Sequence, residues 1–279
     1  MHPIVYEIKD ALKDIYPESE AFSLAKMLLV EGFGFSTLEL YGGKDKDISG
    51  KRRDVLNEMI RRLQKNEPIQ YVLGVETFCG LSFEVNPNVL IPRPETAELV
   101  NWIVDEWGTK PSCRVLDIGT GSGCIPVSLA KLLETSRVES WDISEEALRV
   151  ARMNCERNEV DVLLRQKDVL EASPEGVFYD VIVSNPPYIA DSEKMSMDAN
   201  VLEWEPSLAL FVPDSDPLLF YRKIGELALE MLAEDGALYF EINQAYGMDT
   251  INMLKALGYG QVELRKDAWG NDRMVKAIR

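Results

Sequence analysis

The chain of 279 residues is long enough for more than one domain, and its 47 Asp and Glu against 30 Lys and Arg give a formal net charge of −17. No apolar run reaches the roughly 18 residues of a membrane span, and the N-terminus lacks the charged-then-apolar order of a signal peptide, so we expect a cytoplasmic protein without a membrane partner. Residues 71–279 carry a net charge of −16 and residues 1–70 only −1. Because such a charge repels a phosphate backbone, we expect no stable nucleic-acid binding.

Histidine and cysteine often serve as catalytic or metal-binding residues, but in this chain they predict no such site. His2 is the only histidine, and its place near the terminus predicts no catalytic role. The four cysteines lack the paired spacing of a zinc site, so we predict no metal. We expect them to be buried free thiols in a reducing compartment, and they are Cys79, Cys113, Cys124 and Cys155.

Residues 1–72 are predicted to form an N-terminal helical domain. Apolar residues at helical spacing predict one helix near 18–31 and another near 49–64. The expected buried stripes are Phe22, Leu24, Ala25, Leu28 and Leu29 on the first helix, and Val55, Leu56, Met59, Ile60 and Leu63 on the second. The second helix also carries a basic run that is either a docking face or a solvated helix side, made of Lys51, Arg52, Arg53, Arg61, Arg62 and Lys65.

Residues 73–95 are predicted to link this domain to the rest of the chain. The segment 74–90 alternates in polarity and is interrupted by Gly74, Gly80 and Pro87, which indicates a short β-hairpin. A helix is predicted over 97–104, with Thr96 at or near its N-cap. Arg93 and Glu95 precede it, and they either face a cofactor or form a salt bridge at the helix entry.

From residue 96 to 279, strands and helices alternate, which predicts a mostly parallel sheet covered on both faces. A strand over 114–118 runs into a turn with the pattern Asp117-x-Gly119-x-Gly121-x-Gly123, and a helix follows from about 124 to 134. Glycines let the backbone approach a ligand closely, and the helix N-terminus favours partial negative charge. A dinucleotide fingerprint would need a glycine at position 124, where this chain has Cys124, so the turn predicts a different cofactor.

Polar side chains end three further predicted strands. Asp142 ends the strand over 138–141, where an acid is placed to bind both hydroxyls of a ribose. Asp168 ends the strand over 162–167, and Asn185 follows the strand over 180–184. Because ligands bind at the carboxyl ends of parallel strands, we expect these side chains to share one site.

The tetrapeptide Asn185-Pro186-Pro187-Tyr188 is suited to holding a planar NH2 group. The two prolines lack an N–H and have a fixed φ, so they end the strand in a rigid turn. The Asn185 side chain and a backbone carbonyl offer two acceptors, and Tyr188 offers an aromatic face. An ordinary strand-ending loop explains the same residue types.

Three late strands, over 237–242, 260–265 and 273–278, complete a predicted set of seven. Glu241 lies near the end of the first of them, where it either faces the site or serves as a cap or surface group. The segment from 191 to 203 is rich in Asp, Ser, Met and Asn, and we predict that it is a loop acting as a mobile lid.

The glycine turn and the Asn-Pro-Pro-Tyr sequence, in this order and spacing, resemble class I S-adenosylmethionine-dependent methyltransferases, among which the tetrapeptide marks enzymes that methylate amino groups. The segments 68–74, 78–83 and 89–96 are similar to the HemK family, also called PrmC, which methylates peptide chain release factors. The resemblance covers residues 15–279. It implies a Rossmann-like seven-stranded sheet with its last strand antiparallel, S-adenosylmethionine as cofactor, and methylation of the side-chain nitrogen N5 of a glutamine in a Gly-Gly-Gln motif.

The resemblance also implies a role for each site residue. The methionine side of the cofactor would contact Gly119, Thr120, Gly121, Ser122 and Gly123, its ribose Asp142, and its adenine Asp168 and Val169. The glutamine would be held by Asn185, Pro186, Pro187 and Tyr188, of which Asn185, Pro186 and Tyr188 are the implied catalytic residues and Asn185 also contacts the cofactor. Two departures from the family pattern are Ala97 followed by Glu98, and Glu241-Ile242-Asn243-Gln244; we expect neither to touch the tetrapeptide.

We therefore expect a monomeric release factor glutamine methyltransferase whose helical N-terminal domain helps to bind the release factor. One alternative is an enzyme that methylates a glutamine of a ribosomal protein. Another is a DNA or RNA amino-methyltransferase, which the negative charge disfavours. A third is a donor-binding adaptor without catalytic activity.

Overall fold

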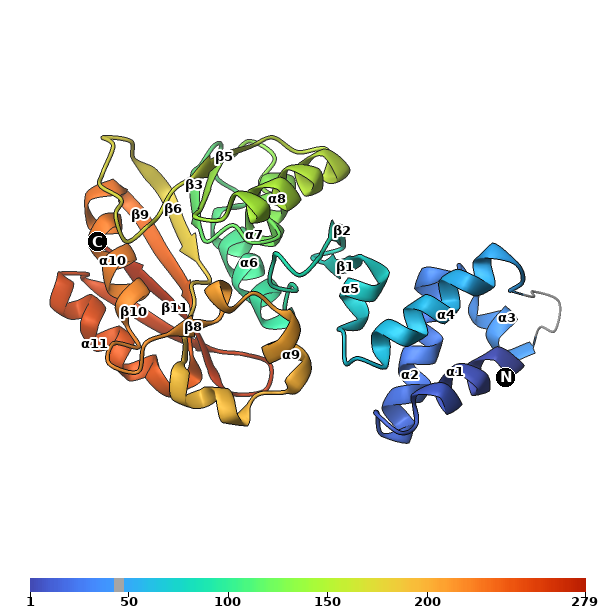
Figure 1. The fold of residues 1–279 in the computed structure, drawn as a ribbon. Coiled ribbons are helices and arrows are strands. Elements are labelled where there is room, and N and C mark those ends of the chain that lie inside the picture. Colours follow the sequence, from blue (N-terminus) through green and yellow to red (C-terminus); the bar gives the residue numbers. More distant parts are fainter. Residues whose placement is uncertain (43–47) are drawn as a thin grey trace. The chain divides into compact units, whose positions relative to one another are not determined.

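The computed structural model describes residues 1–42 and 48–279, which form two compact units (Figure 1). The helical unit consists of residues 1–75 together with 198–204, and the sheet unit consists of 76–197 and 205–279. The chain therefore leaves the sheet unit once, at residue 198, and returns to it at residue 205. Within the described residues, no helix is long and apolar enough to cross a membrane.

Short amphipathic helices build the helical unit around one apolar core. They are α1 (Pro3–Leu12), α2 (Glu18–Met27) with a π-helical continuation over Leu28–Gly32, α3 (Thr37–Gly42), α4 (Lys51–Leu63), α5 (Ile69–Leu73) and α9 (Ala199–Trp204). The core includes Leu12, Leu28 and Leu29, which are fully buried. The indole N–H of Trp204 donates to the Lys65 carbonyl oxygen at 3.2 Å, a contact that attaches α9 to this unit.

The predicted buried stripe of α4 is only partly correct. Leu56, Ile60 and Leu63 are buried, but the side chain of Val55 is half exposed. Adjacent residues lie about 100° apart around a helix, so Val55 falls outside the face that Leu56 directs into the core. Helical spacing alone allowed both residues to be counted as core positions.

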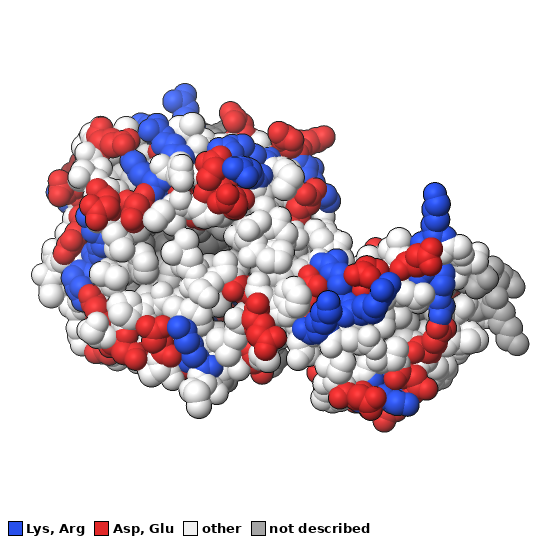
Figure 2. Space-filling view, viewed as in Figure 1, with Lys and Arg blue, Asp and Glu red and all other residues white. Residues whose placement is uncertain are grey.

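Most basic residues of α4 have partners within the helical unit. Arg62 forms an ion pair with Glu67 and also donates to the Val72 carbonyl. Arg53 pairs with Glu7, and Arg52 donates to a backbone carbonyl. These contacts favour the interpretation of the basic run as a packed and solvated helix side. Figure 2 shows Lys and Arg side chains interspersed with acidic ones on this unit.

The sheet unit begins at residue 76, within the hairpin formed by β1 (Val75–Phe78) and β2 (Leu81–Glu84), and helices and strands then alternate. The helices that follow are α6 (Pro94–Trp107), α7 (Cys124–Leu132), α8 (Glu145–Asn158), α10 (Leu219–Met231) and α11 (Gly247–Leu257). A small separate sheet pairs β7 (Ile189–Ala190) with β8 (Phe211–Val212). The strands of the main sheet are β3 (Arg114–Ile118), β4 (Arg137–Asp142), β5 (Val162–Gln166), β6 (Tyr179–Ser184), β9 (Leu232–Glu241), β10 (Gln261–Lys266) and β11 (Asp272–Ile278).

These seven strands pair in the order β10-β11-β9-β6-β3-β4-β5. All neighbouring pairs are parallel except those of β11, which runs antiparallel to β9 and to β10. The fold implied by the family resemblance, a seven-stranded sheet with an antiparallel last strand, is thus confirmed. The carboxyl ends of β3, β4, β6 and β9 share one edge of this sheet.

Apolar side chains on both faces of the central strands hold the helices against the sheet. Val115, Val181 and Val183 belong to a core cluster with residues of α6 and α7, whereas Leu116 and Ile182 belong to a cluster with residues of α10. Consecutive strand residues point to opposite faces, so continuous apolar runs are buried on both sides. This two-sided burial keeps the strand ends in fixed positions beneath the site.

Two local predictions are wrong. Helix α6 begins at Pro94, with Arg93 as its N-cap residue, so Thr96 lies inside the first turn and is buried. Pro94 favours this start because its fixed φ and missing N–H suit the first helical position. The segment predicted as a loop over 191–203 is a 3₁₀ helix at Asp191–Ser196 followed by α9.

The four cysteines are free, as predicted, but only Cys113 and Cys155 are buried. Burial raises the pKa of each of these two thiols to about 11. Cys79 and Cys124 are partly exposed in the structure.

Candidate active site

A cavity of about 230 Å³ opens at the carboxyl edge of the sheet. Four segments line it, each following a strand: the glycine turn after β3, the end of β4, the segment after β5, and the tetrapeptide after β6. The rest of the wall includes Asn88, residues 90–93, Thr96, Pro206, Leu208, Ala209, Phe220 and Ile224. Figure 2 shows a hollow bordered largely by uncharged side chains on the sheet unit.

Positive backbone φ angles shape the glycine turn between β3 and α7. Gly119, Gly121 and Gly123 have φ values of 91°, 53° and 83°, which side-chain-bearing residues rarely adopt. The Gly119 N–H donates to the Trp141 carbonyl at 2.8 Å, and the Gly121 N–H donates to a carboxylate oxygen of Asp142 at 2.8 Å. The turn is therefore fastened to the end of β4.

A buried polar chain supports the turn from within the sheet. The Ser140 hydroxyl donates to Asp117 Oδ2 at 2.5 Å, and Thr120 Oγ1 lies 2.6 Å from the same Ser140 oxygen. Asp117 is fully buried, and burial raises its pKa to about 7, with the nearby Asp142 adding to the shift and the Ser140 hydrogen bond opposing it. Asp117 itself does not line the cavity.

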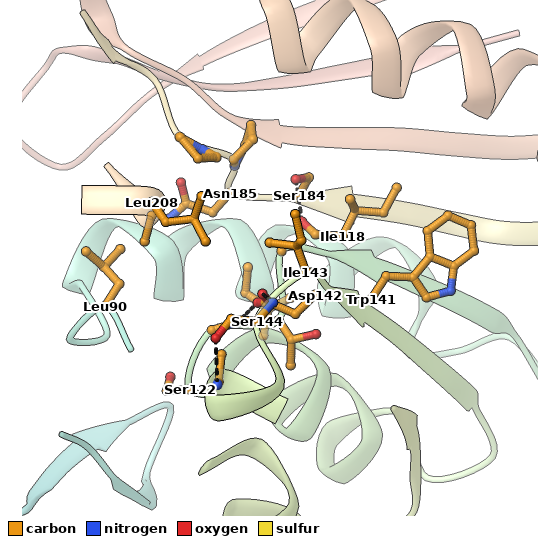
Figure 3. A pocket seen from close by; sticks show the side chains of 18 of the residues that line it. Leu90, Ile118, Ser122, Trp141, Asp142, Ile143, Ser144, Ser184, Asn185 and Leu208 are labelled. Atoms are coloured by element: carbon orange, nitrogen blue, oxygen red, sulfur yellow. Dashed lines mark hydrogen bonds between the residues drawn. The ribbon is translucent and has the colours of Figure 1, made fainter. Parts of the chain in front are cut away.

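Asp142, the predicted ribose-binding acid, ends β4 at the cavity wall. One carboxylate oxygen accepts from Gly121 and the other accepts the Ser144 N–H at 2.9 Å (Figure 3). Burial raises the pKa of this carboxyl group, and the N–H donors act in the opposite direction. Each oxygen has a further lone pair, so the side chain retains acceptor capacity toward the cavity.

The segment after β5 contributes the other predicted cofactor residues. Asp168 and Val169 both line the cavity, and Val169 is buried. Asp168 Oδ1 accepts the Leu170 N–H at 2.9 Å, which holds the start of this segment in a turn. The Lys167 ammonium lies 3.8 Å from the centroid of the Trp141 ring, at the same part of the wall.

Asn185, Pro186 and Pro187 line the cavity beside the glycine turn. A Cβ atom added at Gly119 would lie 3.8 Å from the Asn185 carbonyl oxygen, so the turn and the tetrapeptide approach each other closely. The Asn185 side-chain NH2 donates to Thr96 Oγ1 at 3.2 Å. In Figure 3, Asn185 lies next to Leu208, with Asp142 and Ser144 below them.

Tyr188, unlike the rest of the tetrapeptide, is not among the residues that line the cavity. Its ring packs against the core cluster on the α10 side of the sheet, and its hydroxyl donates to Glu241 Oε1 at 3.1 Å. Burial, together with the neighbouring carboxylate, raises the pKa of its hydroxyl above the ordinary range. Tyr188 therefore lies behind the cavity wall.

The end of β9 supports the tetrapeptide, and one sequence-based expectation here is wrong. The Asn243 side-chain NH2 donates to the Tyr188 carbonyl oxygen at 3.1 Å and to Glu193 Oε1 at 3.1 Å. The departure at Asn243 thus does touch the tetrapeptide, because β9 lies beside β6 in the sheet. In the other departure, Ala97 followed by Glu98, the Glu98 side chain instead accepts the Ala268 N–H at 3.2 Å.

Sequence reasoning missed two residues at this site. Thr96 lines the cavity, and its hydroxyl donates to Glu241 Oε2 at 2.6 Å. Glu205 is buried, forms an ion pair with Arg93, and accepts the Ile91 N–H at 3.3 Å. Arg93 also lines the cavity, so the salt bridge at the helix entry leaves it in the cavity wall. The position of Glu241 at a strand end was the one available signal for the Thr96 contact.

The residues present suit an S-adenosylmethionine molecule. Gly119 and Gly121 carry no side chain and leave the turn open to close approach by a ligand, as a methionine group in this position requires. Asp142 is an acid of the kind that binds ribose hydroxyls, and the apolar Val169 and Ile143 give the wall a surface that would suit a flat base.

Family models and curated relatives match this chain over most of its length. The model described as "Methyltransferase small domain" matches residues 97–203, and the one described as "PrmC N-terminal domain" matches residues 5–74. A release factor glutamine methyltransferase of Bacteroides thetaiotaomicron is 52% identical over 280 residues, covering 100% of both chains. One of Flavobacterium psychrophilum is 44% identical, covering 95% of this chain and 94% of its own.

Solved structures support the fold. The ribosomal protein L11 methylase of Lactobacillus delbrueckii subsp. bulgaricus superposes with a TM-score of 0.51 at 21% identity, covering 71% of this chain and 83% of its own. At this identity the likeness concerns the methyltransferase fold only. The full-length identity to the curated relatives goes further, and the chain belongs to the release factor glutamine methyltransferase family.

Proposed function

We propose that this protein transfers a methyl group from S-adenosylmethionine to the side-chain nitrogen N5 of the glutamine in the Gly-Gly-Gln motif of a peptide chain release factor, and so modulates translation termination. It is an S-adenosylmethionine-dependent methyltransferase. The observation that carries the proposal is the close approach of the Gly119 turn to the Asn185 carbonyl in one cavity, within a chain 52% identical over its full length to a release factor glutamine methyltransferase.

We assign the cofactor to the residues of the glycine turn and the two following strand ends. The methionine part would contact Gly119, Thr120, Gly121, Ser122 and Gly123, the ribose Asp142, and the adenine Asp168 and Val169; Asn185 would contact both cofactor and substrate. When bound, S-adenosylmethionine supplies a methyl group that is already activated by its sulfonium centre. The protein therefore needs to position the nucleophile rather than to generate it.

Asn185 and Pro186 are proposed to hold the substrate amide. The Asn185 side-chain oxygen and a backbone carbonyl at Asn185 or Pro186 would accept the two N–H bonds of the glutamine NH2 and fix its plane. Gripping both N–H bonds favours localisation of the nitrogen lone pair, which resonance otherwise withdraws. A carbonyl acceptor or water would then take the proton that the methylated nitrogen loses. Pro187 shapes the turn, and Tyr188 would act from behind the wall.

We further divide the chain into a helical domain at residues 1–72, a linker at 73–95 and a catalytic domain at 96–279. The helical domain is proposed to help bind the release factor. The match of residues 5–74 to the PrmC N-terminal domain supports a family-specific role for it. The protein is proposed to act as a monomer in the cytoplasm, where translation termination occurs, without stable binding to nucleic acid or membranes.

A methyl-transfer assay tests the function directly. The protein is incubated with methyl-labelled S-adenosylmethionine and a release factor whose motif glutamine is intact or replaced by alanine. We expect label only on the intact factor, because only its glutamine presents the NH2 group. A purified ribosomal protein serves as a further substrate arm. Equal labelling of both release factors, or labelling of the ribosomal protein alone, would contradict the proposal.

A matched pair of enzyme variants links the activity to the tetrapeptide. Asn185→Ala removes the proposed acceptor and is expected to lower kcat by about 10²-fold, the scale of a misplaced reactant. Asn252→Ala changes an exposed asparagine on α11 and should retain the activity of the unchanged enzyme. Comparable activity in the two variants would remove Asn185 from the mechanism.

A further inference from the structure

Glu241 is a buried acid that two polar groups of the site share. Glu241 lies at the end of β9, and only 1% of its surface is exposed. Oε2 accepts the Thr96 hydroxyl at 2.6 Å, and Oε1 accepts the Tyr188 hydroxyl at 3.1 Å. Thr96 Oγ1 in turn accepts a hydrogen bond from the NH2 group of Asn185 at 3.2 Å. One carboxylate is therefore connected to both ends of the tetrapeptide.

The direction of these hydrogen bonds has a consequence for Asn185. An ionised carboxylate only accepts hydrogen bonds, so the single hydroxyl hydrogen of Thr96 is committed to Glu241. Thr96 Oγ1 can then offer only lone pairs to Asn185, and the Asn185 NH2 group must face it. The opposite atom of the same amide, Oδ1, is thereby turned away from Thr96 and left as an acceptor.

We propose that Glu241 is a positioning residue that acts through Thr96 to orient the Asn185 amide, so that Oδ1 rather than the NH2 group faces the substrate nitrogen. The inference rests on the proposed function, because only an NH2-bearing substrate makes this orientation matter. With the reverse orientation, two NH2 groups would face each other and the substrate would lose one of its two acceptors. Thr96 and Glu241 thus decide which end of the Asn185 amide, Oδ1 or the NH2 group, faces the substrate.

The orientation requires the ionised form of Glu241, and the polar groups around it oppose the overall rise in its pKa that burial causes. Burial raises the pKa of this carboxyl group, and the nearby Glu95 adds to that effect. The hydrogen bonds from Thr96 and Tyr188, together with the positive charge of Arg273, lower it again. Arg273 is held in place by an ion pair with Asp267 at 3.2 Å.

A purely structural role for Glu241 predicts a different outcome. Buried hydrogen-bonded acids commonly stabilise a fold, and removing one partner leaves unpaired groups that lower stability. Such a loss reduces the amount of folded enzyme without changing the rate constant of the folded molecules. The orientation role instead predicts a lower kcat in molecules that are fully folded and bind the cofactor normally.

The decisive variants are Glu241→Gln, Thr96→Val and Thr96→Ser. In Glu241→Gln, the glutamine NH2 can donate to Thr96, which frees the Thr96 hydrogen to bond Asn185 Oδ1 and reverses the amide. We expect kcat on the release factor to fall by about 10²-fold in Glu241→Gln and in Thr96→Val. Thr96→Ser keeps the bridging hydroxyl and should retain most of the activity. The Kd for S-adenosylmethionine, measured by calorimetry, should stay unchanged.

Glu106→Gln is the matched control. Glu106 accepts hydrogen bonds from Tyr239 and Trp102, as a partly buried acid on α6 that does not line the cavity. Its replacement should lower thermal stability and leave kcat unchanged. A Glu241→Gln enzyme with the kcat of the unchanged protein, or a Glu106→Gln enzyme with an equal loss, would overturn the inference.

The threonine variants cover the case in which Glu241→Gln does not fold. The comparison of Thr96→Val with Thr96→Ser then decides, and equal activity of these two variants overturns the inference. The unchanged enzyme is assayed first on the release factor. If the unchanged enzyme is active on the release factor and the variants have no effect, the role of Glu241 is refuted and the proposed function stands. If the unchanged enzyme is inactive on the release factor, the proposed function is refuted.

Discussion

At the residue scale, two buried acids of the sheet unit differ in what surrounds them. Glu241 has two hydroxyl donors and a nearby arginine, which oppose the effect of burial on its pKa without cancelling it. Asp117 has one donor, Ser140, while its Oδ1 atom has no hydrogen-bond partner among the described residues. A buried carboxylate with few donors is costly to ionise, which is why the pKa of Asp117 rises to about 7.

This difference predicts a pH dependence of stability. The pKa of Asp117 is raised in the folded state, so its contribution to stability is fully present below about pH 4 and is lost as the pH rises through 7. Asp117→Asn removes that titration. We expect the fall in the free energy of unfolding between pH 5 and pH 8 to be smaller by about 2–3 kcal/mol in the variant.

Urea denaturation of both proteins at the two pH values measures this quantity. The comparison uses the change with pH within each protein, so a constant effect of the substitution on stability cancels. The same pH dependence in both proteins would show that Asp117 does not titrate in this range. Ser140→Ala, which removes the one donor to Asp117, should shift the loss of stability to higher pH.

At the element scale, the turn between β3 and α7 depends on glycine for two separate reasons. Gly121 has a positive φ of 53°, and a Cβ added there would meet open space. Gly123 has a φ of 83°, and a Cβ there would lie 3.2 Å from the Ala151 Cβ on α8. Gly123 thus allows both the backbone conformation and the close packing of α7 against α8.

We expect Gly123→Ala to be the more destabilising substitution. A side-chain-bearing residue in the left-handed region costs roughly 1–2 kcal/mol, and the contact with Ala151 adds to this at position 123. Gly121→Ala should show the conformational cost alone. Gly260→Ala, at a position with ordinary φ and no atom closer than 3.9 Å, should change stability by less than about 0.5 kcal/mol.

Chemical denaturation of the three variants gives the ranking. The expected order of destabilisation is Gly123→Ala, then Gly121→Ala, then Gly260→Ala. If Gly121→Ala were as costly as Gly123→Ala, the packing of α7 on α8 would not contribute, and backbone conformation alone would explain the need for glycine in this turn.

At the scale of the whole molecule, the charge of the protein favours a protein substrate over a nucleic acid. The sheet unit lies in the strongly acidic part of the chain, with 19 Lys and Arg against 35 Asp and Glu in residues 71–279. Basic residues of α4 in the helical unit are largely engaged in internal contacts. A chain of this kind offers few free cations to a phosphate backbone.

We therefore expect no measurable binding of the protein to labelled transfer RNA or duplex DNA at low salt. Fluorescence anisotropy provides the measurement, and the release factor serves as the positive control under the same buffer conditions. Low salt is the demanding condition, because electrostatic binding to nucleic acid strengthens as salt is removed. Saturable binding that weakens as salt is added would contradict the expectation and favour a nucleic-acid substrate.

Much of the fold follows from local sequence patterns. Alternating strands and helices, and apolar runs in the strands, predicted the parallel sheet that the structure contains. The glycine turn, Asp142, Asp168 and Asn185 each follow a strand, and parallel strands bring their carboxyl ends to one edge. All four lie in the wall of the same cavity. The sequence pattern allowed two interpretations for the buried face of α4 at Val55 and for the start of α6 at Pro94.

The sequence by itself determined the class of fold and the strand-end residues that face the cavity, such as Asp142, Asp168 and Asn185, because these depend on period and on strand ends. Only the tertiary structure decided what lies behind them. Thr96, Asn185 and Glu241 are far apart in the chain, and they meet because α6 begins beside the end of β6, where Ser184 pairs with Phe240 of β9. The direction of a hydrogen bond depends on three-dimensional contacts that no spacing encodes, so neither the shared carboxylate nor the placement of Tyr188 could be read from the sequence.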